Sequence, residues 1–195
     1  MAKVAEKKGG KRERLVKAAV DLAYRQGYRS TTLADLATAA EVPLGNIYYY
    51  FKSRDEIGSV ILDHRKEEFT ALQDRLGQLD TPLARLEAFV RMTVANAPMV
   101  AQFGCPMGSL GAELLKEGGD LAARSGALLS RPMTWMAEQF SAMGHGDDAD
   151  GLALHLQSAL QGASLLSYSA GDPSLLQREG TRLLDWLQAL QHSGE

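Results

Sequence analysis

One short segment combines glycine, an amide and a run of tyrosines, which suits it to recognising another molecule. It covers residues 43–52, reads PLGNIYYYFK, and is followed closely by Arg54. Gly45 would let a partner approach the backbone, while Asn46 and the tyrosine hydroxyls offer polar groups on short or rigid side chains. With the positive charges of Lys52 and Arg54, these residue types are typical of a surface that contacts base edges and phosphates.

Side chains that could perform catalysis or bind a metal are scattered elsewhere. The histidines are His64, His145, His155 and His192, and they lack the His-Glu-x-x-His spacing of a zinc site. Neither a phosphate-binding Gly-x-x-x-x-Gly-Lys loop nor a Gly-x-Ser-x-Gly elbow occurs. His145 and the three aspartates that follow it are interpreted as a solvated loop. We therefore expect no catalytic residue, no metal and no cofactor, and a protein that is not an enzyme.

Charge is divided unevenly along the chain. The 195 residues carry 21 Lys and Arg against 24 Asp and Glu, a net charge of -3. Residues 1–54 hold 11 basic and 5 acidic residues, a balance of +6, which leaves 10 basic and 19 acidic residues, or -9, for residues 55–195. Attraction for nucleic acid would therefore be concentrated in the first part. Charge alone fits a solvated lysine-rich tail equally well.

The apolar residues recur at spacings of three and four without sustained alternation, which predicts an all-α fold. Glycines and prolines place the breaks between helices, including one at Pro98. The predicted helices cover residues 11–26, 33–40, 43–52, 53–76, 82–97, 106–117, 121–143, 148–170 and 173–191.

The second and third predicted helices are joined by a very short turn, the arrangement of a helix-turn-helix. Thr31 or Thr32 is expected to cap the second helix, and Pro43 to occupy the first turn of the third, where its missing N–H costs nothing. The third helix would enter a major groove about 12 Å wide. Its helical spacing places these residues on the inward face: Leu44, Ile47 and Phe51.

The same stretch carries a family signature. It reads GYRSTTLADLA from residue 27 and AEVPLGNIYYYFKSRD from residue 40, and it resembles the signature of the TetR family of transcriptional repressors over residues 11 to about 60. The resemblance implies a three-helix DNA-binding domain over residues 11–56 and a helical ligand-binding and dimerisation domain over residues 57–195. Residues 1–10 are expected to form a flexible basic arm.

The resemblance implies a repressor that binds double-stranded palindromic operator DNA as a homodimer and is released by a small-molecule inducer. Thr32 would approach a phosphate, and Tyr48 and Lys52 would contact the DNA backbone. Arg54 is also suited to phosphates, by its charge and its position at the start of the next helix. The implied groove-facing residues are Pro43, Leu44, Gly45, Asn46 and Tyr49. The family usually has serine or threonine around positions 43 and 46 and lysine at 54, so the departures here leave the operator sequence open.

Leucine and alanine stripes in the last two long helices are compatible with a two-fold dimer interface. One stripe comprises Leu152, Leu156, Ala159, Leu160 and Ala163, and the other comprises Leu176, Leu183, Leu187 and Leu190. The alternative is that both stripes face the core of their own chain.

Six of the seven methionines fall between Met92 and Met143, among several aromatic residues. Flexible methionines suit a cavity for apolar ligands, and the scarcity of polar groups favours an apolar or aromatic inducer. The candidate ligand-binding residues are Phe89, Met92, Phe103, Cys105, Met107, Trp135, Met136 and Phe140. Ordinary core packing is the alternative for these side chains.

Cys105 is the single cysteine, which excludes an internal disulfide. It lies in GCPMGSLGAE at the expected start of a helix, where the helix dipole favours a reactive thiolate. The segment is similar to one in a TetR-family subgroup that includes sensors of reactive electrophiles. The alternative is a small apolar residue at a tight junction.

No apolar run approaches the length of a bilayer span, and no secretory signal is evident, so a cytoplasmic protein without membrane contact is expected. Two other function classes stay open. One is a helical interaction module that does not bind DNA, and the other is a small helical enzyme. Salt-dependent binding to one palindromic duplex would distinguish the regulator from both.

Overall fold

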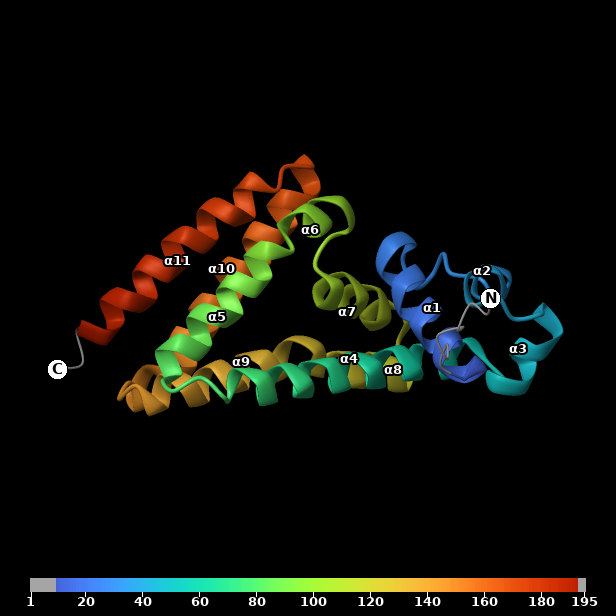
Figure 1. Ribbon diagram of the computed structural model, residues 1–195, viewed down its shortest axis with the longest axis horizontal. Helices are drawn as coiled ribbons and strands as arrows, with labels where there is room; N and C mark the ends of the chain where they lie inside the picture. Colours follow the sequence, from blue (N-terminus) through green and yellow to red (C-terminus); the bar gives the residue numbers. More distant parts are fainter. Residues whose placement is uncertain (1–9, 193–195) are drawn as a thin grey trace, which may run out of the picture.

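The computed structural model describes residues 10–192, and within that range every regular element is a helix (Figure 1). The all-α prediction is confirmed. The helices are α1 (Lys11–Gln26), α2 (Leu33–Ala40), α3 (Leu44–Tyr50), α4 (Arg54–Leu76), α5 (Pro82–Ala95), α6 (Ala97–Phe103), α7 (Pro106–Glu117), α8 (Gly119–Ser125), α9 (Ala127–Ala142), the 3-10 turn η1 (Gly146–Asp148), α10 (Ala149–Ala170) and α11 (Ser174–His192).

Helices α1, α2 and α3 form a small head at one end of the molecule (Figure 1). Thr32 caps α2: its Oγ1 accepts a hydrogen bond from the Asp35 N–H at 3.1 Å, while Asp35 accepts from the Thr32 N–H at 2.9 Å. The hydrogen bonds that the Asp35 carboxylate accepts from the Thr32 N–H and from the Thr32 hydroxyl hold the pKa of Asp35 below its ordinary value. Thr31 instead donates to the Gly27 carbonyl oxygen at 2.8 Å. Thr32 is therefore the N-cap.

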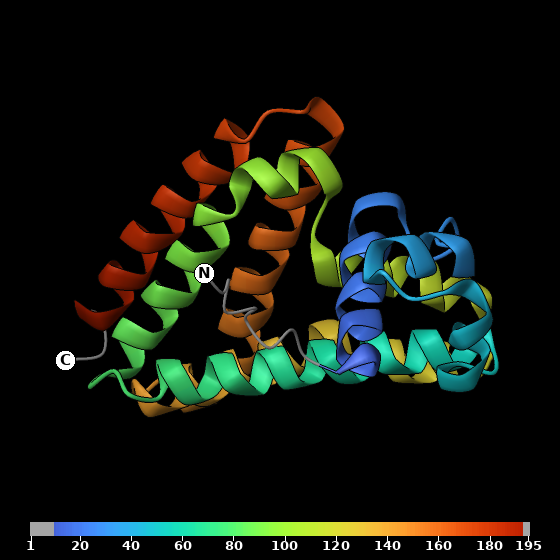
Figure 2. The same cartoon turned by 45° about the vertical axis from the view of Figure 1, so that its right-hand side comes forward.

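Helix α4 leaves the head and runs along the body (Figure 1). Ser53 caps it by accepting from the Glu56 N–H at 3.2 Å, and Asp55 and Glu56 in its first turn suit the positive end of the helix dipole. Helix α9 lies against α4, while α5, α10 and α11 pack together farther from the head, as the rotated view also shows (Figure 2).

The head does not have a hydrophobic core of its own. Leu15, Leu36 and Ile47 of the head belong to one continuous cluster with Leu114 of α7 and Leu121 of α8. Helix α4 also approaches α8 closely, because a β-carbon at Gly58 of α4 would lie 2.8 Å from the Leu121 side chain. A second cluster fills the space among α5, α9, α10 and α11. The body therefore completes the packing of the head.

Three predicted boundaries were wrong. The break predicted at Pro98 falls at Asn96, and Pro98 itself lies in the first turn of α6, a helix that was not predicted. A proline is tolerated there because that N–H needs no intrahelical partner. The predicted helix over 121–143 is divided at Gly126 into α8 and α9, and α9 contains Pro132. The third helix begins at Leu44, with Pro43 as its N-cap.

Of the expected flexible arm, residues 1–9 lie outside the described residues, and Gly10 is the N-cap of α1. Over residues 10–192, none of the helices combines the length and the apolar character needed to cross a bilayer.

Candidate nucleic-acid interface and adjoining cavity

Helix α3 is anchored by two buried side chains and exposes nearly everything else. Ile47 and Phe51 are buried in the head core, whereas Tyr49 is 77% exposed and Tyr48 is 57% exposed. Leu44, which the helical spacing had placed inward, is 47% exposed. It lies in the first turn of α3 and does not belong to the buried cluster of the head. The correction places Leu44 on the same open face as the tyrosines.

A tight turn sets the angle at which α3 leaves α2. Glu41 adopts a left-handed conformation with φ of 54°, and its N–H donates to the carbonyl oxygens of Ala37 and Thr38. The N–H of Val42 also donates to the Ala37 carbonyl oxygen, at 3.0 Å, and the Val42 side chain is buried. These bonds satisfy the last carbonyl groups of α2 and direct the chain into α3.

Gly45 lies in open space on this face. A β-carbon added at Gly45 would meet no atom within 4 Å, so packing inside the protein does not require glycine there. Glycine in a helix costs about 0.5–1 kcal/mol relative to alanine. The open space at Gly45 leaves room for a partner, rather than another part of the protein, to approach the backbone closely. Pro43 and Asn46 flank it and are also exposed.

A concave surface of about 410 Å³ lies beside α3, between the start of α2 and the start of α4. Its lining brings together hydroxyl groups and cations from two separate parts of the sequence. The polar and charged lining residues are Arg29, Thr31, Thr32, Lys52, Ser53 and Arg54. Three of the residues predicted to contact DNA, Thr32, Lys52 and Arg54, are thus neighbours, in an arrangement suited to phosphate groups.

Both cations near α3 also make contacts within the head. Lys52 Nζ donates to the Tyr48 carbonyl oxygen at 2.7 Å and lies 5.9 Å from the centre of the Tyr49 ring. Arg54 Nη2 donates to the Tyr28 carbonyl oxygen at 2.7 Å, and its guanidinium lies 4.9 Å from the centre of the Tyr28 ring. The sequence indicated the charge of Arg54 but not its contacts with Tyr28, because the two residues are distant in sequence.

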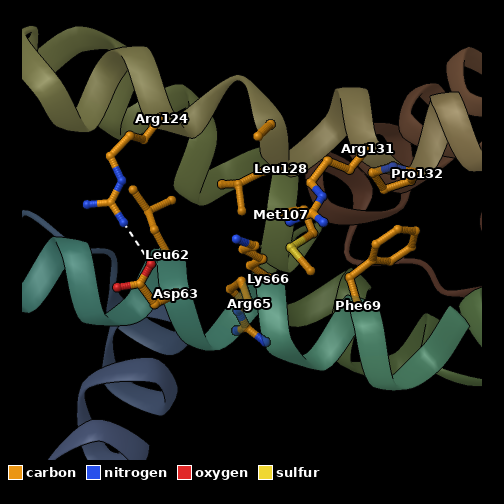
Figure 3. A pocket seen from close by; sticks show the side chains of 11 residues that line it. Leu62, Asp63, Arg65, Lys66, Phe69, Met107, Arg124, Leu128, Arg131 and Pro132 are labelled. Carbon is orange, nitrogen blue, oxygen red and sulfur yellow. Dashed lines mark hydrogen bonds and ion pairs between the residues drawn. The ribbon is translucent and has the colours of Figure 1, made fainter. Parts of the chain in front are cut away.

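A second concave feature, of about 260 Å³, lies where α4 faces α8 and α9 (Figure 3). Its lining residues are Leu62, Asp63, Arg65, Lys66, Phe69, Met107, Arg124, Ala127, Leu128, Arg131 and Pro132. Of the eight candidate ligand-binding residues, Met107 lies in this lining. The other ten lining residues were not predicted from the sequence, although Leu62, Lys66 and Phe69 have the three- and four-residue spacing of one helix face.

The remaining candidate ligand residues lie elsewhere. Met136 and Phe140 are completely buried in the second cluster, where Trp135 packs with its ring centre 5.6 Å from that of Phe89. Met92 is partly buried against the same cluster. Phe103 makes an edge contact with Tyr24 of the head, with ring centres 5.6 Å apart.

Cys105 is the N-cap of α7, and its Sγ accepts a hydrogen bond from the Gly108 N–H at 3.4 Å. The thiol is partly exposed. The preceding residue contacts the head, because Tyr24 Oη donates to the Gly104 carbonyl oxygen at 3.1 Å. Among the residues described, no group of three or more histidine, cysteine, aspartate or glutamate side chains is placed to hold a metal ion.

An exposed short helix that follows a tight turn, on a head rich in basic residues, defines the helix-turn-helix class of DNA-binding proteins. Residues 15–58 match the family model of bacterial regulatory proteins of the tetR family. The chain belongs to the TetR family of transcriptional regulators.

Related proteins agree with this assignment. The chain is 33% identical over 104 residues to the transcriptional regulator AcuR of Cereibacter sphaeroides, covering 51% of this chain and 47% of AcuR. It is 32% identical over 68 residues to the transcriptional repressor NemR of Escherichia coli, covering 35% of this chain and 33% of NemR. The match thus spans about half the length of AcuR and a third of NemR.

The fold extends the similarity beyond the head. The crystal structure of the regulatory protein TetR from Rhodobacter sphaeroides aligns with a TM-score of 0.75 and 27% identity, over 88% of this chain and 95% of that chain. A TetR regulator from Legionella pneumophila aligns with a TM-score of 0.83 at 17% identity, over 93% of this chain and 98% of that one. The second likeness supports the fold alone.

Proposed function

We propose that this regulator binds a palindromic operator as a homodimer, represses transcription, and is released by a small molecule. One observation carries the proposal: α3 is fixed by Ile47 and Phe51 while Gly45 and Tyr49 stand free on its outer face. An exposed side chain on a helix anchored in this way suits contact with base edges in a major groove. The surface around Thr32, Lys52 and Arg54 would contact the flanking phosphates.

The proposed dimer uses a different face of α10 from the one expected. Leu156, Leu160 and Ala163 of the first stripe, and Leu176, Leu183 and Leu187 of the second, are buried in the core of their own chain, so these named side chains are not available to a partner. The exposed large apolar residues of α10 are Leu154, Leu165, Leu166 and Tyr168. Leu154 and Leu165 are separated by eleven residues, or about three helical turns, and so share a face.

Several large apolar side chains left exposed on one helix are typical of a site of association. Pairing the α10 face of one protomer with the same face of its partner would form an isologous contact, with the exposed polar side of α11 at its edge. A two-fold dimer would present two copies of α3 to half-sites about 34–36 Å apart.

Release would act through α4. This helix begins at the head and contributes Leu62, Lys66 and Phe69 to the cavity of about 260 Å³. A ligand that binds the cavity better when α4 has moved away from its DNA-bound position would shift the population toward the released state. Equal affinity for free and operator-bound protein would contradict this coupling.

A second trigger is favoured by the position of Cys105 next to the link between head and body. An electrophile attached to its sulfur would enlarge the N-cap of α7, beside the hydrogen bond from Tyr24 to the Gly104 carbonyl oxygen. Cys105→Ser is expected to abolish a response of operator binding to an electrophile such as N-ethylmaleimide while leaving untreated binding intact. An unchanged response would leave Cys105 with the structural role of a cap.

The proposed function is tested by selecting fragments of the source genome on the full-length protein. Enriched fragments should share one inverted repeat, and the affinity for that repeat measured by fluorescence anisotropy should exceed the affinity for a scrambled duplex by about a thousandfold or more. Uniform, weak binding to every fragment would contradict sequence-specific regulation.

A further inference from the structure

The cavity between α4 and α9 combines apolar side chains with an excess of positive charge. Among its eleven lining residues, four are cationic and one is acidic: Arg65, Lys66, Arg124, Arg131 and Asp63. The apolar part is formed by Leu62, Phe69, Met107, Ala127, Leu128 and Pro132. The hollow is open to solvent, with Lys66 exposed and Arg131 partly buried, so these charges stay hydrated until a ligand covers them.

Two of the four cations already have partners. Arg124 Nη2 pairs with Asp63 Oδ1 at 2.8 Å, and its Nη1 donates to Ser59 Oγ at 2.8 Å, which joins α8 to α4. Arg65 Nη1 pairs with Glu68 Oε2 at 2.8 Å. These bonds account for the single carboxylate of the lining and leave two cations to be explained.

Lys66 and Arg131 are those two. Within residues 10–192, neither the Lys66 ammonium nor the Arg131 guanidinium has an ion pair or hydrogen bond. Figure 3 shows Lys66 extending from α4 toward α9, and Arg131 extending from α9 toward α4. Two unpaired like charges on facing helices repel each other, and an anion bound between them would turn that repulsion into two attractions.

We propose that this cavity binds a small organic acid, with its carboxylate between Lys66 and Arg131 and its apolar body against Phe69 and Leu128. The proposal rests on and deepens the proposed function by naming the chemical class of the releasing ligand, where the sequence favoured an apolar or aromatic compound. Arg131 presents a planar set of donors that can bind both carboxylate oxygens, while Lys66 adds a point charge.

Size and polarity restrict the ligand further. A volume of about 260 Å³ lies below the range typical of drug-sized ligands and fits a monoanion with a short chain or a single ring. An amine would meet two positive charges and be rejected. An inorganic anion would satisfy the cations but leave the surface of Leu62, Phe69 and Leu128 uncovered, and therefore would bind more weakly.

The test measures ligand binding to the full-length protein without DNA, so that it is independent of operator recognition. The probes are benzoate, hexanoate and octanoate, each compared with its neutral amide of nearly equal shape, and inorganic phosphate. Isothermal calorimetry and thermal unfolding should show at least one carboxylate binding and raising the Tm. Its amide and inorganic phosphate should bind at least about tenfold more weakly, which corresponds to about 1.4 kcal/mol.

Variants locate the site. Lys66→Gln and Arg131→Gln should each weaken the best carboxylate about tenfold or more, while leaving its amide unchanged. Arg182→Gln on α11 is the matched control, because its side chain is exposed and removed from the cavity, and it should bind like the parent. Circular dichroism checks that each variant is folded.

Equal binding of carboxylate and amide would overturn the proposal, as would unchanged affinity in both cavity variants or the absence of binding by every carboxylate. If inorganic phosphate bound as tightly as the carboxylates, the cavity would be a simple anion site and not a site for organic acids. Failure of operator selection with intact carboxylate binding would instead contradict the proposed function, so the two failures are distinguishable. Operator release by the same carboxylate, measured by anisotropy, connects the site to regulation.

Discussion

Tyr28 and Arg54 join the turn after α1 to the start of α4 through two reciprocal hydrogen bonds. Tyr28 Oη donates to the Arg54 carbonyl oxygen at 3.0 Å, and Arg54 Nη2 donates to the Tyr28 carbonyl oxygen at 2.7 Å. The guanidinium also lies over the Tyr28 ring. The residue expected to contact a phosphate therefore also fixes the position of the head on α4, and its other N–H groups still suit a phosphate.

Removing the Tyr28 hydroxyl should change both the stability and its pH dependence. Burial raises the pKa of Tyr28 above its ordinary value of 10.0, against the opposing effect of Arg54. A raised pKa in the folded state means that stability is fully present below pH 10 and is lost as the pH rises through the folded pKa. Tyr28→Phe should cost about 1 kcal/mol at neutral pH and lessen the fall above pH 10.

Urea unfolding of both proteins between pH 8 and pH 11 measures this difference. Tyr24, whose pKa burial also raises, is intact in the variant and should account for part of the remaining fall. Parallel stability curves for parent and variant across this range would contradict the buried hydroxyl as a source of the pH dependence.

Tyr49→Ala should weaken operator binding by about tenfold or more and reduce the preference over a scrambled duplex, because the ring is exposed on the proposed groove face. Its free energy of unfolding should stay within about 0.5 kcal/mol of the parent value, as for most surface substitutions. Anisotropy and urea unfolding measure the two quantities. A variant that lost stability but not affinity would assign Tyr49 to packing.

Gly45→Ala should raise the stability of the protein while lowering its affinity for the operator. The added β-carbon meets open space and favours the helix, so the protein should be more stable by up to about 1 kcal/mol. Operator affinity should fall, because the methyl group lies where DNA would approach. A gain in stability with unchanged affinity would mean that DNA does not approach this position closely.

Lys52→Ala tests phosphate contact by its salt dependence. Loss of one phosphate contact should reduce the slope of log affinity against log salt concentration by about 0.9. Binding should weaken on operator and scrambled duplex alike, in contrast to Tyr49→Ala. Lys116→Ala, on the body helix α7, supplies a control that removes the same charge outside the head, and its slope should match the parent's.

Leu165→Glu should convert the proposed dimer to a monomer, because Leu165 is 65% exposed on the α10 face assigned to that contact. Burying an unpaired carboxylate in that contact is strongly unfavourable. Leu115→Glu is the matched control, since Leu115 on α7 is 60% exposed but lies outside the proposed interface. Analytical ultracentrifugation distinguishes the two. A dimer of unchanged affinity for Leu165→Glu would exclude this face.

Sequence periodicity predicted most helices because their ends carry local signals. Thr32 and Gly27 mark the start of α2 and the end of α1 within a few residues. The boundary at Gly126 was missed because the residues on both sides continue a helical pattern, and only the packing of α8 against α4 separates them. Pro98 misled the prediction because proline both ends helices and begins them.

The two candidate sites also differed in how far they could be predicted from the sequence. Residues of the head could be proposed because Gly45, Tyr49 and Lys52 lie within one short segment. The cavity could not, since Lys66 and Arg131 come from helices that the sequence does not show to face each other. Likewise, a leucine stripe indicates a buried face without indicating whether the chain itself or a second copy buries it, and Leu160 proved to face its own core.

The hydrophobic cluster shared by the head, α7 and α8 has a practical consequence for protein engineering. A chimera that exchanged residues 11–56 as a cassette would leave Leu114 and Leu121 without their partners and expose the other side of the same contact. New operator specificity is better introduced by substituting the outer positions of α3, such as Asn46 and Tyr49, which contribute nothing to that cluster. The unit that can be transplanted is a surface rather than a domain.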